Sequence, residues 1–258
     1  LDTLQRQTYQ NFEIVVVDQS ETVSPAKKAA YKASGKKMRI FFPRCKGRSA
    51  AKNIGLSHSR GEIILFCDDD IKPERDFLRT HVEAHRDASL GGVSCRTVED
   101  HLAKSQTNRI CRVTPYGRLI DGFHSDDTRD VETLVGANMS LKRGVALRAG
   151  YFDPSFTGTS IFEEPDLSER ILAAGWKIRF TNATSVHHVP QPDGNLGLRL
   201  QKPVEYYRNF HHNEILFFLK NRNRLQLFLV IPFCLLRSIK QSIVHGCFPR
   251  GVFPMFAG

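Results

Sequence analysis

Residues 47–73 read GRSAAKNIGLSHSRGEIILFCDDDIKP, and this stretch decides the fold that we predict. The small residues at 47–59 predict a helix, and Gly61 ends it. The continuous apolar run at 62–67 is typical of a strand that is buried on both faces, as in a parallel sheet. Three adjacent carboxylates, Asp68, Asp69 and Asp70, follow this strand directly.

A second buried strand closed by an acid lies upstream, where residues 13–18 read EIVVVD and end at Asp18. The pattern also predicts strands at 38–42, 137–141 and 177–181, and helices at 73–85, 143–149, 165–174 and 203–220. This alternation is typical of a doubly wound α/β sheet. Ligands of such sheets bind beyond the carboxyl ends of the strands, so we expect Asp18 and the acidic triplet to lie at the site.

The composition is that of a globular protein, with 41% hydrophobic and 25% charged residues among 258. The formal net charge of +10 favours an anionic partner: nucleic acid, a membrane surface or a phosphorylated substrate. We exclude nucleic acid because no base-reading motif is present. The six cysteines form no C-x-x-C pair, which argues against a zinc ribbon and favours a reducing, cytoplasmic location.

The acidic triplet by itself has two interpretations. Three neighbouring carboxylates repel one another, and a hard dication such as Mg²⁺ or Mn²⁺ relieves that repulsion. Mg²⁺ takes one or two protein carboxylates and leaves positions for substrate phosphate oxygens. The other interpretation is an acidic helix cap before Pro73, because Asp favours such positions.

Four blocks in order resemble family 2 glycosyltransferases. They are TYQNFEIVVVDQS at 8–20, the stretch at 47–73, GANMSLKRGVALRAGYFDPSF at 136–156 and FEEPDLSERILAAGWKI at 162–178. The resemblance implies a GT-A (Rossmann-like) fold with a mixed, mainly parallel sheet flanked by helices. It also implies a hexosyltransferase-type enzyme that moves a sugar from a UDP-, GDP- or dTDP-sugar to an acceptor hydroxyl with inversion, assisted by Mn²⁺ or Mg²⁺.

The resemblance also implies roles for the acids at the strand ends. Asp18 would contact the nucleobase or ribose of the donor, and Asp68 the ribose side. Asp70 would be the metal ligand, and the metal would bridge the donor diphosphate. Asp69 is assigned to the donor site, although it is equally well explained as a solvated side chain.

Basic and histidine side chains complete the expected donor site. Lys52 stands where the family usually carries Arg; it keeps a charge for the donor phosphates but loses the planar fork of the guanidinium. Arg48 and Lys46 could share this task, or they could be ordinary surface cations. Of the adjacent histidines, His187 is preferred over His188 as a metal ligand.

An inverting displacement needs a base near the acceptor hydroxyl. Glu164 is our preferred base and Glu163 the second choice, since both precede a helix whose N-terminus favours ionised carboxylates. Glu164 stands where the family has Asp, one methylene shorter. Asp166 is assigned to the donor site, or it orients the helix through Arg170, four residues on.

The C-terminal region gives two further expectations. We predict a catalytic domain at 1–200 and a helical extension at 201–258. Residues 225–236 read LQLFLVIPFCLL, which is too short for the roughly 20 residues that span a bilayer, and cations flank them on both sides. This pattern fits an in-plane membrane anchor on the inner face of the cell membrane, or equally a helix packed on the domain.

The sequence determines least about the acceptor and about whether the fold is complete. The QxxRW motif of processive relatives is not present, which favours a single addition to a glycan or a lipid-linked acceptor in cell-surface polysaccharide or glycolipid synthesis. The first strand of the fold is expected before Leu1 and is therefore missing. The alternative function is a non-catalytic sugar-nucleotide-binding or scaffold protein with a truncated GT-A fold.

Overall fold

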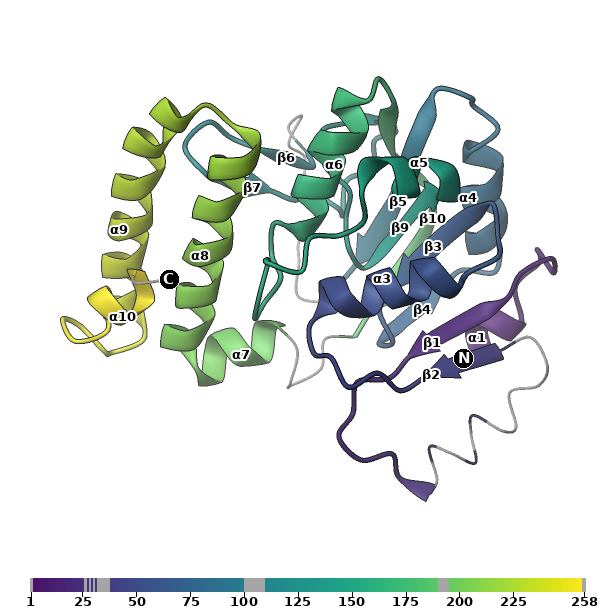
Figure 1. Ribbon diagram of the computed structural model, residues 1–258, viewed down its shortest axis with the longest axis horizontal. Helices are drawn as coiled ribbons and strands as arrows, with labels where there is room; N and C mark the ends of the chain where they lie inside the picture. The colour runs from purple at the N-terminus through teal and green to yellow at the C-terminus, as the bar shows by residue number, and fades with distance from the viewer. Residues whose placement is uncertain are drawn as a thin grey trace.

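A mixed sheet forms the centre of the computed structural model (Figure 1). The structure describes residues 2–25, 27, 29, 31, 38–99, 110–189 and 195–256. The strand order is β3-β9-β5-β10-β4, with β8 also paired to β10. The strands are β3 (Ile63–Cys67), β4 (Ile71–Pro73), β5 (Leu90–Val98), β8 (Arg129–Val131), β9 (Asn138–Lys142) and β10 (Lys177–His188).

The predicted α/β class is confirmed, but the pairing within this sheet is not mainly parallel. Among its described strands only β5 and β10 pair in parallel, and the other pairs are antiparallel. The reason lies in the connections. A parallel neighbour needs a long crossover, whereas the tight turn from β3 to β4 and the insertion of β9 between β3 and β5 reverse the chain direction.

A second, two-stranded sheet contains the first acid-tipped strand. β1 (Ile14–Val17) pairs in parallel with β2 (Met38–Phe41), as the sequence predicted for both strands. The predicted helix α3 (Arg48–His58) packs on β1 and leads into β3. A short hairpin of β6 (Arg112–Val113) and β7 (Leu119–Ile120) lies at the other end of the molecule, near α8 (Figure 1).

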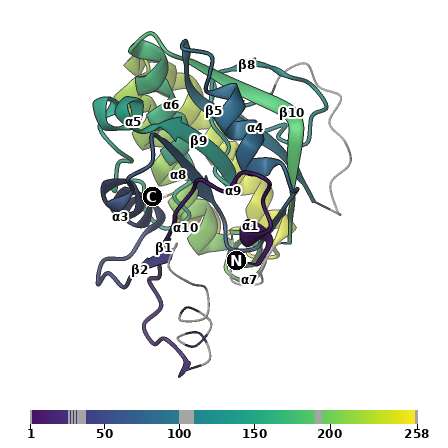
Figure 2. The ribbon, with the colours of Figure 1, turned by 90° about the vertical axis from the view of Figure 1, so that its right-hand side faces the viewer.

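Helices cover both faces of the central sheet. α4 (Phe77–Ala84) lies on one side, and α5 (Arg143–Ala149) and α6 (Glu163–Ala173) lie on the other (Figure 2). Between them the sheet buries an apolar core that includes Leu56, Met139, Leu141, Leu167 and Phe180. The predicted helix at 73–85 begins later than expected, because Pro73 ends β4. That strand is at the edge of the sheet, where a residue without an N–H is tolerated.

The C-terminal third is helical, as predicted. It contains α7 (Asn195–Gln201), α8 (Pro203–Asn221), the 3₁₀ turn η1 (Arg224–Gln226), α9 (Leu227–Val244) and α10 (Val252–Phe256), and α1 (Asp2–Gln5) lies at the opposite end of the chain. α8 packs against α6 and α9 packs against α8, so α9 lies farthest from the sheet (Figure 1).

The apolar segment near the C-terminus is longer than we expected. η1 and α9 form one continuous helical stretch of 21 residues, and its 18-residue apolar window has a mean hydropathy of 1.7 and is only 22% buried. The helix continues beyond residue 236 to Val244, because no Gly or Pro interrupts residues 237–244. By length and composition it could cross a membrane, a test that other apolar helices also pass.

Candidate active site

A cleft of about 1230 Å³ lies between the carboxyl end of the central sheet and the C-terminal helices. It gathers residues from nearly every part of the described chain. Its polar lining includes Arg48, Lys52, Asp68, Asp69, Asp70, Glu99, Arg118, Glu163, Glu164, His188, Arg199 and Arg237. The acidic triplet and the two candidate bases, which are about 95 residues apart in sequence, therefore face the same space.

Three ligand atoms converge where β3 ends. The Nε2 atom of His188 lies 3.2 Å from Oδ1 of Asp70 and 3.8 Å from Oδ2 of Asp68. The ligand atoms of all three residues lie within 4.8 Å of one another. Two carboxylates and an imidazole suit a divalent cation such as Mn²⁺, and the cleft leaves room for phosphate oxygens on its open side.

The histidine in this cluster is His188 and not His187, the residue we predicted. Successive side chains of a strand point to opposite faces, so only one of the pair can face Asp70. The antiparallel register of β10 with β4 places His188 opposite Ile71, directly after the acidic triplet, while His187 is opposite Lys72.

Glu99 was missed in the sequence, and it orients His188. Its Oε1 atom lies 2.8 Å from Nδ1 of His188, so the carboxylate fixes the ring with Nε2 toward Asp70. Glu99 follows the buried strand β5 directly, as Asp18 follows β1 and Asp68 follows β3. The same signal, an acid at the end of a buried strand, could have identified it.

The candidate bases share one ammonium group. Lys52 Nζ lies 2.6 Å from Oε1 of Glu163 and 2.6 Å from Oε1 of Glu164. Ser49 Oγ donates a further hydrogen bond to Glu163, which is 1% exposed, whereas the side chain of Glu164 is 18% exposed. Both carboxylates line the cleft, and Glu164 is the more exposed of the two, while Ser49 and Lys52 hold Glu163 in place.

Burial and charge act against each other in this cluster. Burial and the neighbouring carboxylate of Glu164 raise the pKa of Glu163, while Lys52 and Ser49 act to lower it. Burial disfavours the ammonium of Lys52, but the two carboxylates outweigh burial and raise the pKa of Lys52. Lys52 is therefore charged and engaged with the glutamates, rather than free to bind donor phosphates as we predicted.

A strained turn presents the two glutamates to the cleft. Ser160 and Phe162 adopt positive φ angles of 53° and 80°, which are unfavourable for residues other than glycine. The Phe162 ring is fully buried, with its centroid 5.6 Å from that of Phe210 and 5.5 Å from that of Phe217. Packing against α8 therefore holds the conformation from which α6 begins.

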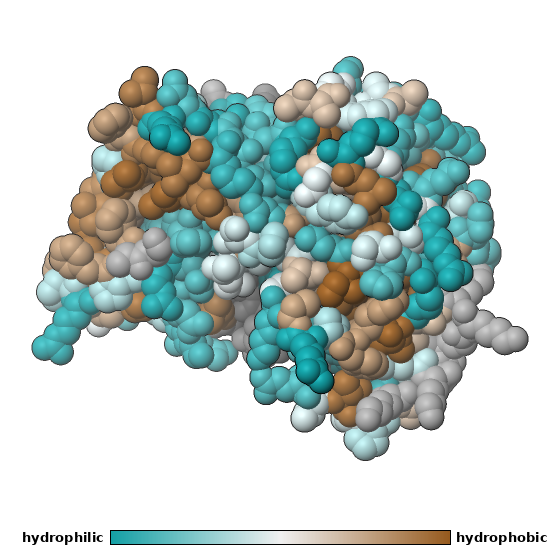
Figure 3. All heavy atoms as spheres, viewed as in Figure 1, coloured by the Kyte–Doolittle hydropathy of each residue, from teal (hydrophilic) through white to brown (hydrophobic). Residues whose placement is uncertain are grey.

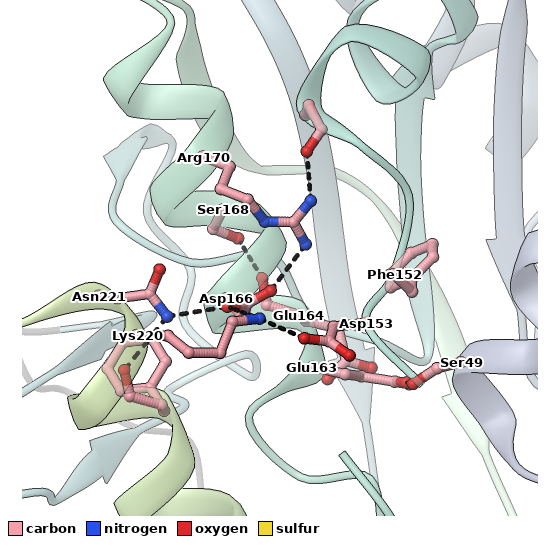
Figure 4. Close-up of polar contacts among 12 residues, drawn as sticks. Ser49, Phe152, Asp153, Glu163, Glu164, Asp166, Ser168, Arg170, Lys220 and Asn221 are labelled. Atoms are coloured by element: carbon pink, nitrogen blue, oxygen red, sulfur yellow. Dashed lines mark hydrogen bonds and ion pairs between the residues drawn. The ribbon is translucent and has the colours of Figure 1, made fainter. Parts of the chain in front are cut away.

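Asp166 does not line the cleft, although we assigned it to the donor site. Its carboxylate is fully buried. It lies 2.7 Å from the Arg170 guanidinium, 2.8 Å from the Asn221 side-chain amide and 3.0 Å from the Lys220 ammonium (Figure 4). The predicted contact with Arg170 is confirmed. Because two of these partners come from the end of α8, Asp166 joins α6 to α8, on the side away from Glu164.

Asp18 lies outside the main cleft, at the end of β1. It accepts hydrogen bonds from the Ser20 N–H at 2.9 Å and the Tyr31 hydroxyl at 3.1 Å, and Lys27 Nζ is 2.9 Å away. Burial opposes its charge, but these three partners hold the pKa of Asp18 well below its usual range. A hollow of about 550 Å³ that includes Ser20 and Phe42 opens beside it.

Comparison with known proteins assigns the family. The family model "Glycosyl transferase family 2" matches residues 1–135, half of the chain. The chain belongs to glycosyl transferase family 2. The resemblance to this family that we described from the sequence is confirmed, and the matched residues include the blocks at 8–20 and 47–73.

Curated relatives match only in part. The glycosyltransferase GlyG of Streptococcus pneumoniae is 34% identical over 77 residues, which are 29% of this chain and 26% of GlyG. An uncharacterized glycosyltransferase of Rickettsia conorii is 27% identical over 93 residues, 31% of this chain and 15% of the relative. The chain thus spans about a quarter or less of these relatives.

Solved structures share the fold at low sequence identity. The mannosyltransferase PcManGT of Pyrobaculum calidifontis, in complex with GDP-Man and Mn²⁺, is 17% identical, with a TM-score of 0.59 over 97% of this chain and 68% of that one. GalNAc-T7 with UDP, GalNAc and Mn²⁺ is 12% identical, with a TM-score of 0.65 over 91% and 48%. These similarities confirm the predicted GT-A fold.

Proposed function

We propose that this glycosyltransferase moves a sugar from a nucleoside-diphosphate sugar to an acceptor hydroxyl with inversion, assisted by a divalent metal. The observation that carries the proposal is the shared cleft: a cluster with the chemistry of a metal site, Asp68, Asp70 and His188, and a carboxylate, Glu164, open to the same space. Solved relatives that hold Mn²⁺ with a nucleotide or nucleotide sugar support it.

The chain's own residues supply the remaining steps. A divalent cation held by Asp68, Asp70 and His188 would supply Lewis-acid stabilisation of the leaving diphosphate. Glu164 accepts the proton of the acceptor hydroxyl as the new bond forms. Lys52 bridges the two carboxylates at 2.6 Å each and so holds Glu164 in position at the cleft. Asp18, on its separate sheet, is left as the contact for the nucleoside.

We extend the proposal to the acceptor and the setting. The acceptor is a glycan or a lipid-linked sugar, used in making a cell-surface polysaccharide or glycolipid, in the cytoplasm at the inner face of the membrane. The cleft supports an extended acceptor, because its far wall is built by Tyr206, Phe210 and Arg237 from the C-terminal helices. Aromatic faces and a guanidinium are suited to sugar rings and their hydroxyls.

The metal and donor sites are tested by thermal stability. With Mn²⁺ present and UDP at about 100 times its dissociation constant, UDP binding should stabilise the folded chain by about 2.7 kcal/mol, seen as a rise in Tm. Asp70→Ala should abolish the part of the shift that needs Mn²⁺. Asp69→Ala, a matched change in an exposed neighbour outside the cluster, should retain it. Equal loss in both variants would contradict the assignment of the cluster.

Transfer and inversion need a separate experiment. UDP-, GDP- and dTDP-sugars should be screened for slow hydrolysis, and the anomeric configuration of the released sugar followed by NMR during the first minutes. The proposal expects one nucleotide class to be hydrolysed with inversion. Metal-dependent nucleotide binding without hydrolysis or transfer would instead favour the non-catalytic binding protein.

A further inference from the structure

We propose that the outer face of α9 docks on an anionic membrane surface, with the helix lying in the plane of the interface. The outer face is defined by eight exposed apolar side chains, the first in η1 and the others in α9: Leu225, Phe228, Leu229, Ile231, Leu235, Leu236, Ile243 and Val244. Figure 3 shows hydrophobic side chains gathered at this end of the molecule, over α9 at the left of the view. The proposal does not depend on the function proposed above.

In α9 the large apolar side chains are exposed and smaller, partly polar ones are buried, which is the reverse of a helix that packs on a protein core. Its fully buried side chains are Val230, Cys234, Ser238 and Ser242, a stripe of small and partly polar residues that faces α8. Its large apolar side chains point outward instead; Phe228 is 77% exposed and Leu236 is 64% exposed. A surface helix in water shows the opposite arrangement, so this face is built to contact something apolar.

The helix cannot turn its apolar face inward, because its inner face is fixed to α8. The guanidinium of Arg237 donates to both carboxylate oxygens of Glu214, at 2.9 and 3.2 Å, and Cys234 Sγ donates to the same carboxylate at 3.0 Å. Glu214 is fully buried. Rotating α9 would leave this carboxylate without its cation.

The charge of the surrounding surface selects the occupant. The last acidic residue of the sequence is Glu214, and the 44 residues after it contain six Lys or Arg and no Asp or Glu. Arg224, Lys240 and Arg250 are exposed, and Lys240 lies four residues after Leu236 on the outer face of α9. Anionic lipids attract such cations, whereas a second copy of the chain would bring like charges together.

The contact with α8 determines that the helix lies in the interface rather than spans the bilayer. α9 packs along α8, and α8 packs against α6. α8 carries polar side chains throughout its first two thirds, including Glu205, Arg208, Asn209, His211, His212 and Glu214. A spanning α9 would draw these side chains into hydrocarbon, which is costly, while an in-plane helix buries only its outer face.

Vesicle co-sedimentation of the whole chain tests the proposal. We expect binding to vesicles of phosphatidylcholine with phosphatidylglycerol at about 3:1, and much weaker binding to phosphatidylcholine alone. The double variant Phe228→Asp with Leu236→Asp should bind at least about 10-fold more weakly, since each substitution removes the burial of a large apolar side chain. Tyr151→Asp with Leu200→Asp, a control change of two exposed hydrophobic residues outside α9, should bind as the natural chain does.

The role of surface charge in docking is tested by a second pair of matched variants. Lys240→Glu should weaken binding by about 10-fold or more, and Arg86→Glu, the same charge change on an exposed residue beyond α4, should have little effect. Binding should fall as salt is raised, because exposed charges are screened. Equal binding to neutral and anionic vesicles would overturn the anionic-surface proposal.

Two further outcomes would overturn the proposal as stated. If the natural chain ignores anionic vesicles and instead forms a dimer that Phe228→Asp with Leu236→Asp dissolves, the face is a contact between copies. If the bound chain resists extraction by alkaline carbonate, α9 spans the bilayer. The Tm of each variant, and its shift with Mn²⁺ and UDP, separates a folding defect from lost docking and from failure of the proposed donor site.

Discussion

Two buried carboxylate clusters show how the same residue types serve different purposes in this molecule. At the start of α6, one ammonium, Lys52, contacts two carboxylates, Glu163 and Glu164. Between α8 and α9, one carboxylate, Glu214, receives both nitrogens of Arg237. The first cluster holds two carboxylates for one ammonium, and both carboxylates line the cleft. In the second cluster the single carboxylate, Glu214, is fully buried and pairs with one guanidinium, so only Arg237 reaches the wall of the cleft.

The second cluster also includes a thiol and an imidazole that stay neutral. Burial and the charge of Glu214 raise the pKa of Cys234, and burial lowers the pKa of His211 in spite of Glu214. These ligand types are close enough to hold a metal, but the Arg237 guanidinium already neutralises the carboxylate. The comparison teaches that a surplus of charge at an open cleft marks chemistry, and a balance in the interior marks structure.

The largest effect is expected from a substitution in the first cluster. Glu164→Gln removes the carboxylate that faces the cleft and should lower the turnover of donor and acceptor by about 10²- to 10⁴-fold, since proton transfer is lost. Stability should change little, because a neutral amide can still accept from Lys52. The measurement is the transfer rate at saturating substrates together with the Tm.

A matched control lies on the same helix. Glu169→Gln makes the same change at a glutamate that pairs with Arg222 outside the cleft, and its turnover should be close to that of the natural chain. If both variants lose activity equally, Glu164 is not the base. A normal rate in Glu164→Gln would assign the role to Glu163.

The second largest effect is expected from a substitution in the cluster between α8 and α9. Glu214→Gln leaves the guanidinium of Arg237, whose side chain is 16% exposed, without its buried counter-charge and should lower the free energy of unfolding by about 3 kcal/mol, the lower end of the range for a broken buried pair. Replacing both partners, Glu214→Leu with Arg237→Met, should recover most of that loss because no buried charge is left. Urea denaturation measures both. A stable Glu214→Gln variant would show that the pair contributes little to the fold.

A smaller effect comes from the backbone beside Glu164. A Cβ atom at Gly136 would lie 2.2 Å from Oε1 of Glu164, so Gly136→Ala must displace that carboxylate. We expect turnover to fall by about 10-fold, as strain of this kind typically costs 1 to 3 kcal/mol. Gly144→Ala, within α5, meets only the end of the Arg148 side chain at 3.7 Å and should keep activity and gain helix stability. Equal activity of the two variants would mean that the position of Glu164 is not critical.

The last effect is a shift in pH dependence. Lys52 acts to lower the pKa of Glu163, so Lys52→Met should raise it further. The site works with Glu163 ionised beside Lys52, so activity is present above the pKa of folded Glu163 and is lost as pH falls through it. The acidic limb of the pH–rate profile should therefore move to higher pH, by about one to three units. An unchanged limb would show that these glutamates do not set it.

Sequence patterns were sufficient where a property depends on neighbours along the chain. The apolar runs before Asp18 and Asp68 gave β1 and β3, and local spacing gave α3, α5, α6 and α8 close to their observed bounds. The pairing of the central sheet was not predictable in this way. Whether a strand lies parallel or antiparallel to its neighbour depends on which distant strand is inserted beside it, as β9 is between β3 and β5.

The sequence by itself determined the fold class, the family and the presence of acids at the ends of buried strands, because these follow from local periodicity and motif order. Only the tertiary structure decided which side chains meet. Strand register selected His188 over His187, and packing against α8 turned Asp166 away from the cleft. It also engaged Lys52 with two glutamates and turned the apolar face of α9 outward. Each of these depends on contacts between segments far apart in the chain, which no local pattern encodes.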